Sequence, residues 1–182
     1  MSLGDKNRVK ILVVGPAKCG KTCISSYVAD TTEFANKEYR PTKGVRILEL
    51  ESADFRIPHQ RPERIIELWD CSGDKKYESC WSALRLGAHG AVLVADPEKT
   101  TGDELLLWFN EFVVKTGLRL DHVMVLLHHT SERTNDSAIA DFRLPQQMSG
   151  VYTVPSNIDH EGESLKTEFN NFLMQLFGES TN

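Results

Sequence analysis

The sequence has no apolar stretch that approaches the ~20 residues of a transmembrane helix, and its amino terminus has no signal-peptide pattern. Ser2 stands where N-myristoylation requires a glycine, and residues 178–182 contain no cysteine for prenylation. We therefore expect a protein with no lipid anchor and no direct membrane insertion.

Paired cysteines and a positive net charge are also missing. The four cysteines form no C-x-x-C pair, which argues against zinc and favours a reducing compartment. A formal net charge of −5 argues against a broad nucleic-acid surface. Length and an ordinary apolar content predict one domain over residues 1–182.

The most informative stretch is residues 15–22, which read GPAKCGKT and match the phosphate-binding loop pattern. An apolar run at 9–14 predicts a strand before it, and residues 23–29 predict a helix after it. Backbone N–H groups of such a loop wrap a phosphate, and the helix N-terminus adds its positive dipole.

Within this loop, each side chain has an expected role. Lys21 would reach the β- and γ-phosphates, and the Thr22 hydroxyl would bind Mg²⁺. Lys18 either leans over the phosphates or points to solvent. The other expected nucleotide contacts here are Ala17, Cys19, Gly20 and Cys23.

Strands and helices alternate along the rest of the chain. Further strands are predicted at 44–51, 63–69, 88–95, 122–127 and 151–154, and the first two of these would pair antiparallel across a loop at 52–62. Helices are predicted after a cap at Thr101 or Asp103, briefly near 137–142, and at 163–177. The pattern indicates an α/β fold, a doubly wound and mostly parallel sheet with helices on both faces.

Two more elements suit a nucleotide. Asp70 follows a predicted strand and would hold Mg²⁺ through water, while Gly73 would bring its N–H to a γ-phosphate. Thr42, just before a strand, would offer the metal a second hydroxyl. Alone, D-x-x-G is a common turn and such a threonine a loop residue, but their order after the phosphate loop is typical of a switch.

With these motifs in place, the sequence resembles Ras-superfamily small GTPases of the Rab-like group. The segments that carry the resemblance are 41–45 (PTKGV), 69–73 (WDCSG) and 87–91 (GAHGA). Residues 41–51 and 67–81 resemble more closely the family called Rab-like protein 5 or intraflagellar transport protein 22.

The resemblance implies a P-loop G-domain with a six-stranded sheet and one antiparallel edge strand. It also implies bound GTP or GDP with Mg²⁺ and a role in assembling cilia or flagella within transport complex B. The implied partners are the coiled-coil subunits 74 and 81, and the implied location is the cytoplasm and the cilium, with its basal body and axoneme.

Hydrolysis is expected to be very slow or absent. Asp74 occupies the position of the glutamine that orients the attacking water, and it brings negative charge towards the γ-phosphate. Ala17 stands where small GTPases often have glycine. With Lys21 as the other catalytic candidate, the chain would be at most a very slow GTPase.

The guanine-reading motif Asn-Lys-x-Asp is missing. Residues 128–131 read His-His-Thr-Ser, so Ser131 replaces the aspartate, and Glu132 or Asp136 would have to substitute for it. Either His129 stacks on the base, or both histidines are partly solvated residues at a strand end. Ser156 and Asn157 resemble the Ser-Ala-Lys loop and would touch the base, with micromolar affinity overall.

Three functions compete on these residues. The first is a docking subunit whose switch loops are ordered by nucleotide, with Tyr77 and Trp81 as partner contacts, although Trp81 could equally pack in the core. The second is a structural pseudo-GTPase that docks in any nucleotide state. The third, a small P-loop kinase, is disfavoured because the later arginines are scattered and no lid insert is visible.

Overall fold

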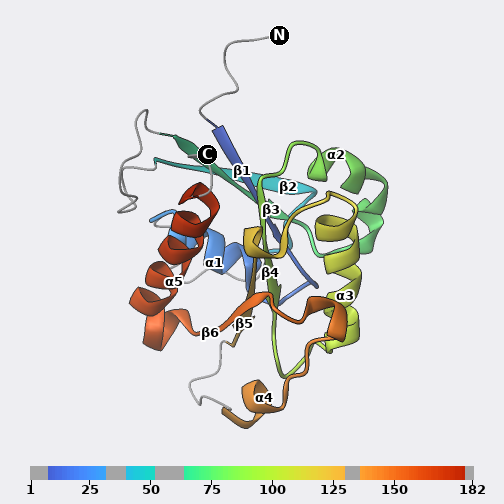
Figure 1. The fold of residues 1–182 in the computed structure, drawn as a ribbon, viewed down its shortest axis with the longest axis vertical. Helices are drawn as coiled ribbons and strands as arrows, with labels where there is room; N and C mark the ends of the chain where they lie inside the picture. Colours follow the sequence, from blue (N-terminus) through green and yellow to red (C-terminus); the bar gives the residue numbers. More distant parts are fainter. Residues whose placement is uncertain (1–7, 32–39, 52–63, 130–135, 179–182) are drawn as a thin grey trace.

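Six strands form one sheet in the order β2-β3-β1-β4-β5-β6 (Figure 1). The structure is a computed structural model that describes residues 8–31, 40–51, 64–129 and 136–178. The strands are β1 (Arg8–Val14), β2 (Val45–Glu51), β3 (Ile65–Cys71), β4 (Gly90–Ala95), β5 (Val123–His128) and β6 (Tyr152–Ser156).

The strand directions are those that the sequence predicts. All neighbouring pairs are parallel except β2 and β3, which pair antiparallel at one edge with Leu48 opposite Leu68. The loop predicted at 52–62 lies outside the described residues. β4 and β5 are buried along their whole length, as expected for strands covered on both faces.

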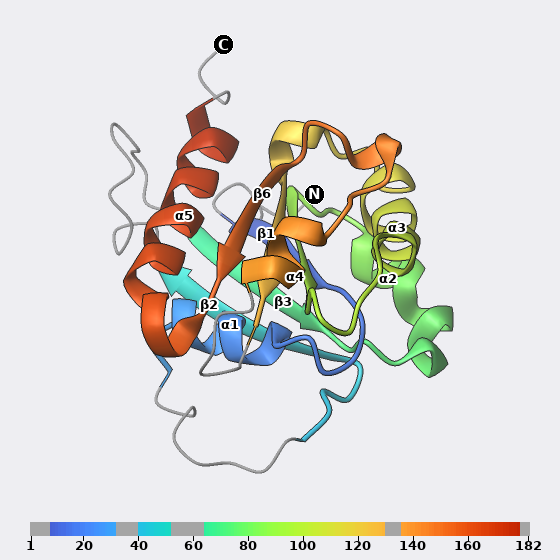
Figure 2. The same ribbon diagram turned by 90° about the horizontal axis from the view of Figure 1, so that it is seen from below.

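Helices cover both faces of the sheet. On one side lie α1 (Lys21–Val28) and α5 (Ile158–Gly178); on the other lie α2 (Trp81–Arg85) and α3 (Gly102–Phe109), which continues into a π-helix, η4 (Asn110–Val114) (Figures 1 and 2). The short elements in the described part of the chain are α4 (Asp136–Asp141) and the 3-10 helices η3 (Lys75–Cys80), η5 (Leu120–His122) and η6 (Gln146–Met148). No described helix is long and apolar enough to cross a membrane.

Helix ends follow their capping residues. Thr101, one of two predicted caps, accepts a hydrogen bond from the backbone N–H of Glu104 and starts α3. α5 begins five residues earlier than predicted, at Ile158, and contains a non-helical residue at Glu161. Its first turn is stabilised by Asn157, whose side-chain oxygen accepts from the N–H of Asp159 at 3.0 Å.

The sheet separates two apolar cores. Under α1 and α5, the predicted apolar face of α5 is buried, as expected; it consists of Leu165, Phe169, Phe172, Leu173 and Leu176. On the other face, Trp81 is 2% exposed and packs 5.0 Å from Trp108 and 5.4 Å from Phe112 between ring centroids. Trp81 was predicted either to contact a partner or to pack in the core, and the structure shows that it packs in the core.

A lysine lies among the apolar residues of β1, between Val9 and Ile11. Lys10 is 8% exposed, and its ammonium sits 3.5 Å from the centroid of the Trp69 ring and donates to the Leu86 carbonyl at 3.0 Å. Burial lowers the pKa of Lys10. The cation–π contact and the carbonyl provide the partners that a buried ammonium requires.

Candidate nucleotide site

The phosphate loop runs from the carboxyl end of β1 to the start of α1. Its glycines are required by geometry: Gly15 has φ 146° and a Cβ there would lie 2.2 Å from the Val94 carbonyl oxygen. Gly20 has φ 90°, and its Cβ would lie 2.2 Å from the His128 ring. Lys18 adopts φ 63°, which is uncommon for a side-chain-bearing residue.

The loop folds back onto its own lysine. Lys21 is buried, and its ammonium donates to the Pro16 carbonyl at 2.5 Å, with Cys19 Sγ at 3.6 Å. Cys19 is also buried, which raises its thiol pKa. Ala17, Lys18 and Cys23, three of the other predicted contacts, are exposed on the loop and on the first turn of α1.

Three side-chain oxygens converge beside Lys21. Thr22 Oγ1 donates to Asp70 Oδ2 at 2.7 Å and lies 2.9 Å from Thr42 Oγ1, which donates to the same carboxylate oxygen at 3.3 Å. The sequence predicts Thr22 at the end of the phosphate loop, Thr42 before a strand and Asp70 directly after one. In the structure Thr22 lies in α1 and Asp70 in β3, and the three side chains converge, while their roles as metal ligands stay predictions.

The convergence suits a hard divalent cation. Asp70 is fully buried, and its Oδ1 has no hydrogen-bond partner among the described residues. Burial raises the pKa of Asp70, and the hydrogen bond from Thr22 acts against that rise. A carboxylate and two hydroxyls are the oxygen donors that Mg²⁺ prefers, so these residues fit the ion.

Gly73 packs directly on the phosphate loop. A Cβ at this position would lie 2.4 Å from the Ala17 nitrogen and 2.5 Å from the Pro16 carbonyl carbon. The D-x-x-G segment therefore lies against the loop, where the sequence predicts a contact with the terminal phosphate, and only glycine allows this approach.

The Asp74 carboxylate is occupied by its own helix. It caps η3 by accepting from the Lys76 N–H at 3.0 Å, and it pairs with the Lys76 ammonium at 2.8 Å. The hydrogen bond from Lys76 lowers the pKa of Asp74. Both oxygens of the Asp74 carboxylate therefore bind Lys76 of η3.

The two histidines at the end of β5 are buried, so the prediction that both are partly solvated was wrong. His128 is 2% and His129 is 5% exposed, because the end of β5 lies between the phosphate loop and the loop after β6. His128 Nδ1 lies 3.0 Å from Ser156 Oγ while its ring contacts Gly20. Burial lowers the pKa of His128 to about 4, and His129 adds to that shift.

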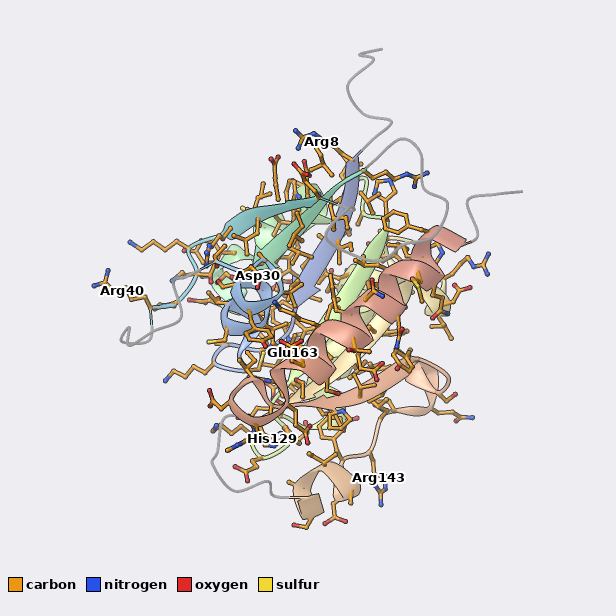
Figure 3. The ribbon with its side chains drawn as sticks, turned by 90° about the vertical axis from the view of Figure 1, so that its left-hand side faces the viewer. Arg8, Asp30, Arg40, His129, Arg143 and Glu163 are labelled. Carbon is orange, nitrogen blue, oxygen red and sulfur yellow. The ribbon has the colours of Figure 1, made fainter. Side chains whose placement is uncertain are left out.

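His129 differs from its neighbour. Neither ring nitrogen has a hydrogen-bond partner among the described residues, although the backbone N–H donates to the Ser156 carbonyl at 3.2 Å. Figure 3 shows it at the carboxyl edge of the sheet. Ser131 and Glu132 lie outside the described residues. Buried polar atoms normally have hydrogen-bond partners, so the two ring nitrogens of His129 are candidates to bind a ligand.

Sequence reasoning missed Asp96, which directly follows β4 at the same edge. It is 5% exposed, accepts from the Glu98 N–H at 3.0 Å and pairs with Lys99 at 2.5 Å. A single carboxylate after a fully apolar strand was the available signal. Asp96 shapes the turn after β4 and contributes to the electrostatic environment of His128.

Comparison of the sequence with known proteins shows the family of this chain. Residues 10–131 match the family model described as Ras of Complex, Roc, domain of DAPkinase. The zebrafish intraflagellar transport protein 22 homolog is 36% identical over 180 residues, covering 95% of this chain and 94% of the relative. The chain belongs to the intraflagellar transport protein 22 family.

Solved structures agree with this family assignment. The GTP-bound crystal structure of T. brucei IFT22/74/81 aligns with a TM-score of 0.75 at 27% identity, covering 96% of this chain and 98% of that chain. The GDP-bound T. brucei IFT22 structure aligns with a TM-score of 0.72 at 26% identity, covering 95% and 98%. The predicted G-domain fold with one antiparallel edge strand is confirmed. The match to the zebrafish relative covers 95% of this chain, so it includes residues after 130, where the motif resemblance is thin apart from the final helix.

Proposed function

We propose that this chain binds GTP and GDP with Mg²⁺ and acts as a docking subunit of intraflagellar transport complex B, working in the cytoplasm and the cilium or flagellum, including its basal body and axoneme. The observation that carries the proposal is the convergence of Thr22, Thr42 and Asp70 beside the buried Lys21. This set offers oxygen ligands to a cation and an ammonium to phosphates within one loop system.

The residues divide into phosphate, metal and base contacts. The loop N–H groups of residues 17–23 would hold the α- and β-phosphates, with Lys21 moving from the Pro16 carbonyl to the β- and γ-phosphates. Thr22 and Thr42 would hold Mg²⁺, with Asp70 acting through water. The bound ion would neutralise charge on the phosphate oxygens.

Base recognition rests on His129, Ser156 and Asn157. The side-chain oxygen of Asn157 caps α5 and the Ser156 hydroxyl lies near His128, so the imidazole of His129 is the group with open hydrogen-bonding capacity among the described residues of this loop pair. Guanine would be held without a carboxylate. Each lost hydrogen bond to a charged partner costs about 1.5–3 kcal/mol, which supports micromolar affinity.

Hydrolysis would be very slow or absent. The Asp74 carboxylate caps η3 and pairs with Lys76, so orienting a water would require breaking both contacts. Carboxylates also cannot donate the hydrogen bond that a glutamine amide supplies to the transition state. The same observation favours the second candidate, a pseudo-GTPase that docks regardless of nucleotide state.

The partners would be the coiled-coil subunits 74 and 81. The T. brucei relative was crystallised as IFT22/74/81, and that chain aligns over its full fold with this one. Of the two aromatic residues predicted to contact a partner, Trp81 is in the core, and the half-buried Tyr77 on η3 therefore remains the candidate.

Titration calorimetry of nucleotide-stripped protein with GTP, GDP and ATP in Mg²⁺ tests the proposal. We expect micromolar, guanine-selective binding that Lys21→Ala or Thr22→Asn abolishes. The matched controls Lys166→Ala and Thr167→Asn change the same residue types on α5 and should bind normally. Equal affinity for ATP, or no binding, would contradict it.

Docking is measured separately. Immobilised coiled coil of subunits 74 and 81 is exposed to apo, GDP-loaded and GTP-loaded protein. A preference for one loaded state supports a switch, whereas full binding by Thr22→Asn supports the pseudo-GTPase. Loss of binding in every state would contradict both docking functions.

A further inference from the structure

A cavity of about 310 Å³ opens at the end of the sheet opposite the phosphate loop. Its walls come from the starts of strands: Val9 in β1, His89 before β4 and His122 before β5. Figure 3 labels Arg8 at this end of the molecule and His129 at the nucleotide end. The cavity is therefore separate from the site described above.

The lining is cationic. Arg64, His89, Arg119 and His122 line the cavity, and none of the described lining residues is an aspartate or a glutamate. Arg119 pairs with Asp121 outside the lining at 2.5 Å. Two arginines and two histidines therefore line one cavity in a chain of net charge −5.

Neighbouring positive groups also act on His89. Burial lowers the pKa of His89, the charges of Arg64, His122 and Lys10 lower it further, and Glu67 acts in the opposite direction. The permanent charges in the lining are the guanidinium groups of Arg64 and Arg119, of which Arg119 also pairs with Asp121. An acidic group entering here would meet complementary charge.

The remaining walls are apolar. Leu118 follows η4, and Leu176 and Phe177 come from the last turn of α5. The Arg64 guanidinium carbon lies 5.3 Å from the centroid of the Phe177 ring, so charge and apolar surface adjoin.

A second cavity of about 540 Å³ continues the first, sharing Gly117 and Leu118 with it. It is lined by Phe109, Val113 and two exposed aliphatic side chains, Val114 (57% exposed) and Leu120 (39%). The π-helix η4 carries Val113 and Val114. Such helices are rare and are often found at functional sites.

We propose that these two cavities form one docking groove for an amphipathic helix of a partner protein that carries acidic residues at one end of its apolar face. Apolar side chains of the helix would lie along Val114, Leu118 and Leu120, and its carboxylates would reach Arg64 and Arg119. A groove that is apolar at one end and cationic at the other fits an extended amphipathic segment better than a compact ligand. The groove needs no nucleotide, so this proposal stands apart from the proposed function.

Fluorescence anisotropy with labelled helical peptides of about 18 residues, or five turns, tests this. One peptide contains leucine, alanine and glutamate, and the other has lysine in place of every glutamate. We expect the acidic peptide to bind with an affinity that falls as salt rises. The double variant Arg64→Glu/Arg119→Glu should lose about 10-fold in affinity for it and gain affinity for the lysine peptide.

Matched variants locate the contact. Arg143→Glu makes the same charge change at the other end of the molecule and should leave binding unchanged (Figure 3). Leu120→Asp should weaken binding, whereas Met174→Asp, at a similar exposure on α5, should not. Thermal melting confirms that each variant is folded. No binding, equal binding of both peptides, or insensitivity to the double reversal would overturn the proposal.

Discussion

At the scale of single residues, His128 links the two halves of the nucleotide site. Its ring contacts Gly20 of the phosphate loop and lies 3.0 Å from the Ser156 hydroxyl. An asparagine holds this position in the motif that the sequence lacks. A buried imidazole can make the same bridge only while it is neutral, since charging it would place an ion in the interior.

This burial makes stability dependent on pH. The pKa of His128 falls from 6.5 to about 4 on folding, so the unfolded chain binds the proton more tightly between these values. Stability should be fully present above pH 6.5 and fall as the pH drops towards 4, by about 3 kcal/mol in total. Urea unfolding at several pH values measures this.

The control is His128→Asn, which keeps a polar bridge without a titrating ring. Other carboxylates and histidines also titrate over this range, so the informative quantity is the difference between the wild type and the variant. Parallel pH profiles for the two proteins would contradict the assignment.

The proximity of the motif residues could be predicted from their chemistry and order along the chain, whereas their roles in binding stay predictions. Lys21, Thr22, Thr42 and Asp70 each have a side chain that phosphate or a divalent cation requires, and the structure brings all four to one place. The burial of His129 could not be predicted, because histidine is found on surfaces and in cores alike. Only the packing of two loops against the end of β5 decides it.

At the scale of elements, the segment after β3 is held against the phosphate loop through Gly73. Gly73→Ala would place a methyl 2.4 Å from the Ala17 nitrogen and push the two segments apart. We expect GTP affinity to fall by roughly 10-fold, about 1.4 kcal/mol, and GDP affinity to fall less. Calorimetric titration with both nucleotides measures the difference.

Gly87→Ala is the matched control. Gly87 has φ 71° and open space around a Cβ, so the substitution strains the backbone without touching the phosphate loop. It should cost stability, about 1 kcal/mol, and leave both affinities unchanged. Equal losses of GTP and GDP affinity in Gly73→Ala would refute a selective contact with the terminal phosphate.

We expect Trp81 of α2 to stabilise the fold and Tyr77 of η3 to contact a partner. Trp81→Ala removes a side chain packed on Trp108 and Phe112, and we expect it to destabilise the fold by about 3–5 kcal/mol. Tyr77→Ala, four residues earlier on the half-buried face of η3, should change stability little and weaken binding of the coiled-coil partners. Denaturation and partner titration of both variants measure this. Unchanged partner binding in Tyr77→Ala would remove η3 from the interface.

Element types and order were predictable because the strands are near-continuous apolar runs and α5 has one apolar stripe. The antiparallel pairing of β2 and β3 followed from a single connecting loop without helical pattern. The π-helix at the end of α3 was not predictable, since its residues Asn110–Val114 fit the preceding helical pattern. Phe112 and Val113 of this segment are buried, but the same burial would be expected of a continuing α-helix, so the wider turn is visible only in three dimensions.

At the scale of the whole molecule, the two ends of the sheet carry opposite kinds of site. The carboxyl ends of the parallel strands hold the phosphate loop and the buried Asp70, as the topology of such sheets requires. The amino ends carry the cationic cavity with Arg64 and Arg119. One partner can therefore contact the switch segments while another lies in the groove, because the body of the sheet separates them.

Nucleotide binding should stabilise the whole fold, because its proposed contacts come from the phosphate loop, α1, β3 and the ends of β5 and β6. A ligand at 100-fold excess over its Kd stabilises the native state by about 2.7 kcal/mol, and at 1,000-fold excess by about 4 kcal/mol. Thermal unfolding with GTP and Mg²⁺ should therefore shift to higher temperature in proportion to the logarithm of nucleotide concentration.

The nucleotides should differ in the size of this shift. GDP should give a shift similar to that of GTP. ATP, which differs from GTP only in the base, should give a smaller one. His129→Ala should reduce the GTP shift towards that of ATP, and Thr22→Asn should abolish the shifts for all nucleotides, while His160→Ala, an exposed histidine on α5, should behave as wild type. A shift that is equal for GTP and ATP in the wild type would show that the phosphates alone are recognised and that the base is not read.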